Sequence, residues 1–236
     1  EGVAFFSLEM TDMELTDRLI ASESGISADK LKGKVKMNPE EWVVLEQSIK
    51  RLVKAPLYID ETPGITLTEF TAKAKRLVRE KGVKIIFVDY LQLMHSGKPQ
   101  QGGFSKVQEV TEISNTLKTT AKDLKVPIIA LAQLNRNLMS RAGSNGKPVL
   151  SDLKDSGSIE QDADMVIFIH RPGMVGMSED LTEAEILIAK NRSGKVGSIE
   201  MKYNGDLVRF EDVAPFYESM MNAEPKPAQP VQKQNP

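Results

Sequence analysis

The segment Lys84–Met94, which reads KIIFVDYLQLM, joins an apolar run directly to an acidic residue. Its apolar residues 85–88 are mostly β-branched, and they predict a strand buried on both faces of a parallel sheet. Asp89 then stands at the carboxyl end of that strand, where open α/β sheets bind their ligands. A carboxylate at this edge suits a magnesium ion held on a nucleotide phosphate. Alone, the pattern also fits an aspartate that only ends a strand and caps the next segment.

Composition limits the class of protein. The chain has 236 residues, of which 40% are hydrophobic and 27% charged, enough for one sizeable core or two small ones. We expect no contact with a membrane and a cytoplasmic location, because the sequence has no apolar run of membrane-spanning length and no signal-peptide pattern. The absence of cysteine excludes disulfides, and the two separate histidines, His95 and His170, argue against a zinc site. Because the net charge is −2, any nucleic-acid binding must come from local basic loops.

Strand-like and helix-like segments alternate along the chain, which predicts an α/β fold with a parallel sheet and helices on both faces. The expected strands are short, apolar and bounded by turn signals: Val3–Ser7, Leu57–Asp60, Lys84–Val88, Pro127–Leu131, Met165–Ile169 and Ala184–Ala189. The expected helices have apolar residues at helical spacing: Thr11–Ala21, Pro39–Val53, Thr66–Lys81 and Val107–Leu124. Thr11 and Glu14 form a capping-box pattern at the start of the first helix.

The C-terminal part has a different pattern. Residues 198–203 and 207–210 flank Asn204-Gly205 and predict a β-hairpin. We expect one domain over residues 1–222 and a disordered tail over 223–236, because that tail is rich in proline, glutamine and lysine. Since the chain begins without methionine inside a strand-like segment, we also expect it to be part of a longer protein.

Further polar residues stand where expected strands end. Glu9 follows the first strand, Gln133 follows the fourth, and Lys190 and Arg192 follow the last. We expect Glu9, Asp89 and Gln133 to converge at one edge of the sheet, although each alone fits a cap or a surface residue. A phosphoryl-transfer site would use an aspartate on magnesium, a glutamate that polarises the attacking water and an amide that senses the γ-phosphate. A cation on a distant strand could reach a nucleotide held by a neighbouring subunit.

Two long loops are expected at the same edge, at Ser96–Gly103 and Asn135–Lys154. Loops of this length in a compact domain are usually functional or disordered. The second loop carries four cations, Arg136, Arg141, Lys147 and Lys154. Without an aromatic residue among them, they favour phosphate contact over base stacking, and a solvated surface loop is the alternative.

Five motifs together resemble the C-terminal motor domain of DnaB-type bacterial replicative DNA helicases, which are RecA-like hexameric ATPases. The motifs keep the family's order and spacing over residues 2–210: FSLEM (6–10), DYLQLM (89–94), AQLNR (132–136), LSDLKDSGSIEQDAD (150–164) and AKNRSG (189–194). The resemblance implies a RecA-like P-loop NTPase core, the cofactors ATP and Mg²⁺, and movement in the 5′ to 3′ direction on single-stranded DNA. It implies a homohexamer, with primase and a helicase loader as partners, working on the nucleoid.

The resemblance also implies roles for individual residues. Glu9 matches the family's catalytic glutamate, and Asp89 matches the Walker B aspartate that acts on magnesium through water. Gln133 matches the residue that couples the γ-phosphate to the DNA loops. Lys190 and Arg192 match the basic pair that acts on the ATP of the adjacent protomer, with Arg192 as the arginine finger.

Another set matches the family's contacts to DNA. Lys154, Asp155 and Gly157 match positions that contact DNA phosphates in the central channel, and we expect Arg136 and Arg141 to contribute. The family more often has Arg and Glu at positions 154 and 155. Because lysine lacks the guanidinium fork, we expect phosphate contact with looser geometry.

One element of the family pattern is missing from the printed sequence. No Gly-x-x-x-x-Gly-Lys-[Ser/Thr] occurs in the 236 residues. The amides and lysine of such a loop cradle the phosphates, so we expect that these residues alone do not hydrolyse ATP and that the parent protein does. Two alternatives remain: a RecA- or KaiC-like ATPase, and a non-catalytic module that binds DNA or partner subunits.

Overall fold

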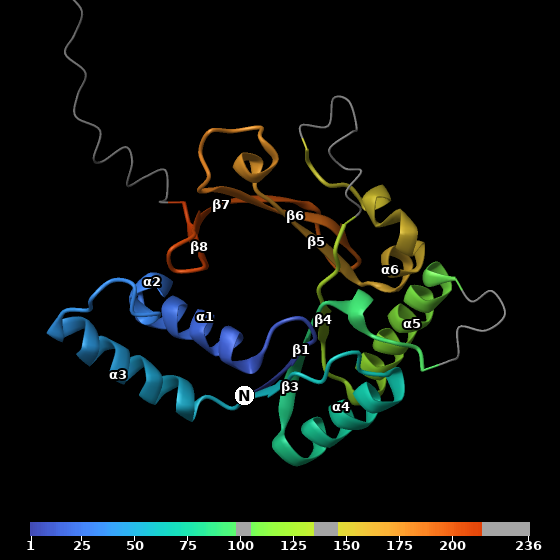
Figure 1. The fold of residues 1–236 in the computed structure, drawn as a ribbon. Coiled ribbons are helices and arrows are strands. Elements are labelled where there is room, and N and C mark those ends of the chain that lie inside the picture. Colours follow the sequence, from blue (N-terminus) through green and yellow to red (C-terminus); the bar gives the residue numbers. More distant parts are fainter. Residues whose placement is uncertain (98–104, 135–145, 214–236) are drawn as a thin grey trace, which may run out of the picture.

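The computed structural model describes residues 1–97, 105–134 and 146–213, and only the backbone of residues 154–156 (Figure 1). Short 3₁₀ helices are labelled η. The elements in chain order are β1 Gly2–Ser7, α1 Asp12–Ser24, α2 Ala28–Leu31, α3 Pro39–Lys54, β2 Leu57–Asp60, α4 Leu67–Lys81, β3 Val83–Asp89, η1 Leu91–Leu93, α5 Lys106–Leu124, β4 Ile128–Ala130, η3 Leu150–Ser156, α6 Gly157–Asp162, β5 Met165–His170, η4 Pro172–Val175, β6 Glu183–Asn191, β7 Gly197–Asn204 and β8 Arg209–Asp212.

The first sheet is parallel and has the strand order β2-β1-β3-β4. Its main core lies on one face, where alternate side chains of β1 and β3 pack against α4 and α5. Phe6 of β1 and Phe70 of α4 are fully buried, with ring centroids 4.8 Å apart in an edge-on arrangement. The predicted helices and parallel strands of this half are therefore confirmed.

The other face of this sheet differs from the prediction. Phe5 and Phe87 stack with centroids 5.9 Å apart and are only half-buried, as are Val3 and Ile85. The expectation that residues 85–88 are buried on both faces is therefore wrong for the described part of the chain. The reason is that α4 and α5 cover one face, whereas α1 and α3 pack against each other on the opposite side of the parallel strands (Figure 1).

The second sheet is antiparallel and has the order β5-β6-β7-β8. The strands expected at Met165–Ile169 and Ala184–Ala189 exist as β5 and β6, but their expected place in the parallel sheet is wrong. A parallel connection needs a crossover, usually a helix. The segment between β5 and β6 offers only the four-residue η4, so the chain reverses direction and pairs antiparallel.

Helix starts agree with their sequence signals. Thr11 caps α1, and its side chain and that of Glu14 complete the predicted capping box. Thr66 lies just outside α4 as its N-cap, not in its first turn. Reciprocal bonds of this kind satisfy amides that a helix leaves without partners at its start.

The predicted hairpin is present as β7 and β8, but the second strand begins at Arg209 rather than at residue 207. Residues 205–208 form the turn, with Val208 at a φ of 53°. The end of the loop expected at Asn135–Lys154 is wrong, because η3 begins at Leu150. Most of both predicted loops, at 98–104 and 135–145, and the tail at 223–236 lie outside the described residues. None of the described helices is long and apolar enough to cross a membrane.

Candidate functional site

The ends of β1 and β3 bring two acidic residues together. Ser7 and Asp89 are register partners, and the Leu8 amide donates to the Asp89 carbonyl at 2.8 Å. Glu9 follows at once, exposed, while Asp89 is half-buried. Burial raises the pKa of the Asp89 carboxyl above its ordinary value, and the negative charge of Glu9 raises it further. The two carboxylates are thus close enough to repel each other, as two acids of one site would.

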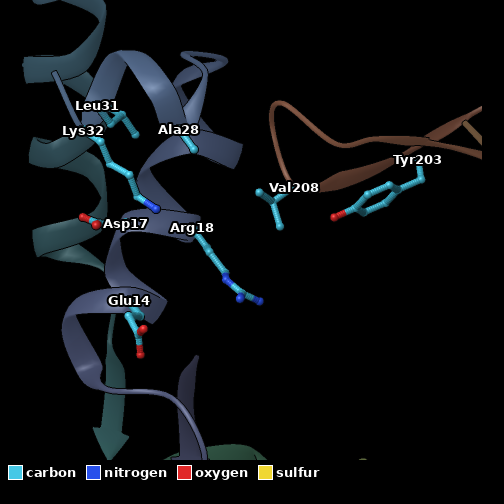
Figure 2. Close-up of a pocket in the computed structure, with 8 residues that line it drawn as sticks. All are labelled: Glu14, Asp17, Arg18, Ala28, Leu31, Lys32, Tyr203 and Val208. Atoms are coloured by element: carbon cyan, nitrogen blue, oxygen red, sulfur yellow. The ribbon is translucent and has the colours of Figure 1, made fainter. Parts of the chain in front are cut away.

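Arg18, on α1, is a third charged residue near this pair. Its positive charge lowers the pKa of Asp89 and partly offsets the effects of burial and of Glu9. Figure 2 shows its side chain extending from α1. Nothing in the helical pattern of the sequence separates Arg18 from an ordinary surface arginine, so its position near Asp89 could not be predicted.

The backbone of Gln133 is fixed beside β3 by Gln92, a residue to which the sequence motifs assigned no role. The Gln92 side chain donates to the Gln133 carbonyl at 3.0 Å, and the Gln133 amide donates back to Gln92 at 3.3 Å. Leu131 is held in turn, since its amide donates to the carbonyl of Val88 at 2.9 Å. Gln92 lies within the quoted DYLQLM motif, so the motif itself was the available signal. Because β3 lies between β1 and β4, the ends that carry Glu9, Asp89 and Gln133 share one edge.

These residues suit a magnesium ion that arrives with a nucleotide. Within residues 1–97, 105–134 and 146–213, no three histidine, cysteine or acidic side chains form a group that could hold a metal. Mg²⁺ commonly uses one or two carboxylates and takes its other ligands from phosphates and waters. A single strand-end aspartate such as Asp89 fits that mode and does not fit an all-protein metal cage.

Lys190 and Arg192 lie at the end of β6, in the second sheet. The Lys190 ammonium donates to the carbonyls of Glu160 and Gln161 in the last turn of α6. Arg192 donates to the Gln161 carbonyl at 2.8 Å and to a carboxylate oxygen of Asp164 at 3.2 Å. Cations are favourable at the carboxyl end of a helix, where carbonyls lack partners within the helix.

The residues predicted to contact DNA are placed only in part. Gly157 begins α6, and Lys154 and Asp155 lie in η3, where only their backbone is described. Arg136 and Arg141 lie outside the described residues. A further cation of the same predicted loop, Lys147, forms an ion pair with Glu185 at 2.6 Å.

One pocket in the described part of the chain shares Arg18 with this edge but none of the strand-end residues. It has a volume of about 400 Å³ and lies between the first two helices and the β7–β8 hairpin (Figure 2). Its lining mixes charged and apolar residues: Glu14, Asp17, Arg18, Ala28, Leu31, Lys32, Tyr203 and Val208. None of the predicted site residues lines it, so we do not assign the chemistry to this pocket.

The hairpin is tied to the first helices by bonds between the two ends of the chain. Arg209 donates to the Ser22 carbonyl at 3.2 Å, and the Ala28 amide donates to the Asp206 carbonyl at 3.2 Å. Arg171 stacks on Tyr203, with its guanidinium carbon 3.9 Å from the ring centroid. The bonds of Arg209 and Asp206 join the second sheet to α1 and α2, whereas the stacked pair lies within the second-sheet half.

Comparison with known proteins gives consistent results. A family model described as "DnaB-like helicase C terminal domain" matches residues 1–212. The replicative DNA helicase DnaB of Leifsonia xyli subsp. xyli is 42% identical over 213 residues, which are 90% of this chain and 45% of that protein. The chain thus spans about half the length of the curated relatives it matches.

Two solved structures have the same fold. One is described as an ATPase domain, with a TM-score of 0.82 and 32% identity, covering 90% of this chain and 75% of that one. The other is a DnaB-like replicative helicase described with its interactions with primase, with a TM-score of 0.81 and 32% identity, covering 90% and 51%. The α/β, RecA-like fold class predicted from the sequence is confirmed.

Proposed function

Because this chain belongs to the family of DnaB-like helicase C-terminal domains, we propose that it is the motor domain of an ATP-dependent replicative DNA helicase. The whole protein would move 5′ to 3′ along single-stranded DNA and unwind duplex at the replication fork. The observation that carries the proposal is the pair of interacting carboxylates, Glu9 and Asp89, at the carboxyl edge of the parallel sheet.

In this proposal the residues at the strand ends have different roles in ATP hydrolysis. Glu9, the more exposed acid, polarises the attacking water and takes up its proton. Asp89 would hold Mg²⁺ through water, and the bound ion would supply positive charge to the phosphates. Burial and, less strongly, the charge of Glu9 raise the pKa of Asp89, and a bound cation would oppose both effects by favouring the charged carboxylate. Gln133, held by Gln92, senses the γ-phosphate at the end of β4.

The remaining predicted residues would act between subunits and on DNA. Lys190 and Arg192 would stabilise the transition state on the ATP of the adjacent protomer in a homohexamer. Lys154, Asp155 and Gly157 would contact DNA phosphates in the central channel, together with the arginines at 136 and 141. A solved relative is described with its interactions with primase, and we propose primase and a helicase loader as partners of the whole protein on the nucleoid.

The decisive experiment measures ATP hydrolysis with and without single-stranded DNA, for the 236-residue chain and for the full-length protein. We expect DNA-stimulated hydrolysis in the full-length protein and none in the 236 residues alone. In the full-length protein, Asp89→Asn and Arg192→Ala should each abolish hydrolysis and leave hexamers intact. Arg79→Ala, an exposed arginine on α4, serves as the matched control and should be fully active.

Two results would contradict the proposal. Absence of hydrolysis in the full-length protein, with DNA still bound, would favour the non-catalytic module. Normal turnover in Arg192→Ala would disprove the arginine-finger assignment while leaving the helicase assignment in place.

A further inference from the structure

Asp164 and Gln161 fix the position of Arg192. The backbone amide of Arg192 donates to the Asp164 carbonyl at 2.9 Å, which extends the β5–β6 ladder by one bond. The two terminal nitrogens of its side chain are held separately, Nη1 by Asp164 Oδ1 at 3.2 Å and Nη2 by the Gln161 carbonyl at 2.8 Å. Two bonds at different points of a planar guanidinium fix its plane as well as its place.

Asp164 in turn is held from another helix. Its second oxygen, Oδ2, accepts from the ammonium of Lys118 on α5, and this contact is the main reason why the pKa of Asp164 lies below its ordinary value. A second hydrogen bond joins α5 to the same segment, because Ser114 on α5 donates to Asp162 at 2.7 Å. The carboxylate of Asp164 therefore connects Arg192 to α5 through its two oxygens.

We propose that Asp164 is a positioning residue for the trans-acting Arg192, which it holds through one oxygen while Lys118 holds the other. This inference rests on the proposed function, because Arg192 needs a defined position only if it reaches a neighbouring protomer's nucleotide.

The contacts of Arg192 fix the position of its side chain without blocking its access to another ligand. A guanidinium has five N–H donors, and the contacts among the described residues use two of them, so others remain for phosphate oxygens. The Arg192 side chain is also 51% exposed despite its contacts. Ion pairs this exposed contribute little to stability, so the effect of Asp164 should be on turnover rather than on folding.

The test uses the full-length protein with Asp164→Ala, and it measures kcat and KM for ATP at saturating single-stranded DNA. We expect kcat to fall about 10- to 100-fold, which is the effect of a small misplacement of a catalytic group, and KM to change by less than about threefold. Asp164→Asn keeps an oxygen for Nη1 but places an amide nitrogen, which cannot accept from the ammonium, opposite Lys118, so its kcat should lie between those of the Ala variant and the native protein. Asp123→Ala, an exposed aspartate near the end of α5, is the matched control and should be unaffected.

A kcat for Asp164→Ala within twofold of the native value overturns the proposal. So does an increase in kcat, which would mean that the contact restrains Arg192. If Asp164→Ala melts at a lower temperature or no longer forms hexamers, Lys118→Met is tested in its place. A kcat of Lys118→Met at least twofold below the native value, with an unchanged KM, supports the proposal. An unchanged kcat in that variant overturns it. Failure of the proposed function is distinct, because the native protein itself would then show no DNA-stimulated hydrolysis.

Discussion

The bonds between Gln92 and Gln133 allow a quantitative prediction. Gln92→Ala removes both side-chain bonds to the Gln133 backbone, at 3.0 and 3.3 Å. Each such bond contributes about 0.5–1.5 kcal/mol net, so local opening at Gln133 should become easier by about 1–3 kcal/mol. Since amide exchange follows local opening, the Gln133 amide should exchange roughly 5 to 150 times faster.

Hydrogen exchange read by NMR measures this effect residue by residue. The Leu131 amide is an internal control, because it donates to the Val88 carbonyl at 2.9 Å and keeps that bond in the variant. Gln47→Ala, an exposed glutamine on α3, controls for loss of a glutamine in general. Unchanged exchange at Gln133 in Gln92→Ala would refute the reasoning, and equal acceleration at both amides would point to global opening instead.

Three further predictions concern stability. Asp89→Asn should raise the melting temperature of the free protein at neutral pH, because folding raises the pKa of Asp89 and so disfavours its charged form. Phe70→Ala should lower the free energy of unfolding in urea by about 3–5 kcal/mol, because Phe70 is fully buried against Phe6. Lys73→Met should cost about 1–3 kcal/mol near pH 7, because it removes the 2.7 Å ion pair with the half-buried Asp60, and the cost should be smaller in acid, where only the bond to Thr62 remains to be lost.

The sign of the acid effect follows from the pKa of Asp60. Burial alone would raise this pKa, but the hydrogen bonds from Lys73 and Thr62 outweigh burial and bring it below its ordinary value. A carboxyl of this kind adds stability above its unfolded pKa, and this stability is lost as pH falls through the folded pKa. Urea titrations of both proteins at several pH values give the difference directly, and a difference as large at pH 2 as at pH 7 would contradict the assignment.

The other two predictions have equally clear tests. A lower melting temperature in Asp89→Asn would mean that the carboxylate is stabilising where it lies, which is the opposite of what its raised pKa implies. A loss below about 1 kcal/mol in Phe70→Ala would mean that the face between β1 and α4 is not a packed core. Phe5→Ala on the half-buried face is the comparison, and it should cost less.

Patterns among residues close together in the sequence were sufficient to predict most of the helices and strands. The Thr11 and Glu14 capping box was predicted because it needs only residues three apart, and it is present. The strand ending at Asp89 was predicted because an apolar run followed by an acid depends on neighbours alone. The same is true of Glu9 and Gln133 at neighbouring strand ends, although their roles stay predictions.

Relations between distant segments could not be predicted in this way. The burial of residues 85–88 depends on which helices cover each face, and the direction of β6 depends on what its connection contains. The contacts of Gln92 with Gln133 and of Arg192 with Asp164 join residues 41 and 28 positions apart. Side chains of these types have many surface uses, so their partners become evident only in three dimensions.

The bonds between the hairpin and the first helices have a consequence for folding during synthesis. Arg209 and Ser22, which bond to each other, are 187 residues apart. Ribosomes add about 5–20 residues per second, so residues 206–209 are made on the order of 10–40 s after α1 and α2. Contacts that close so long a loop form late, and they slow folding more than they stabilise the product. We therefore expect α1 and α2 to complete their packing only after residues 206–209 have been made.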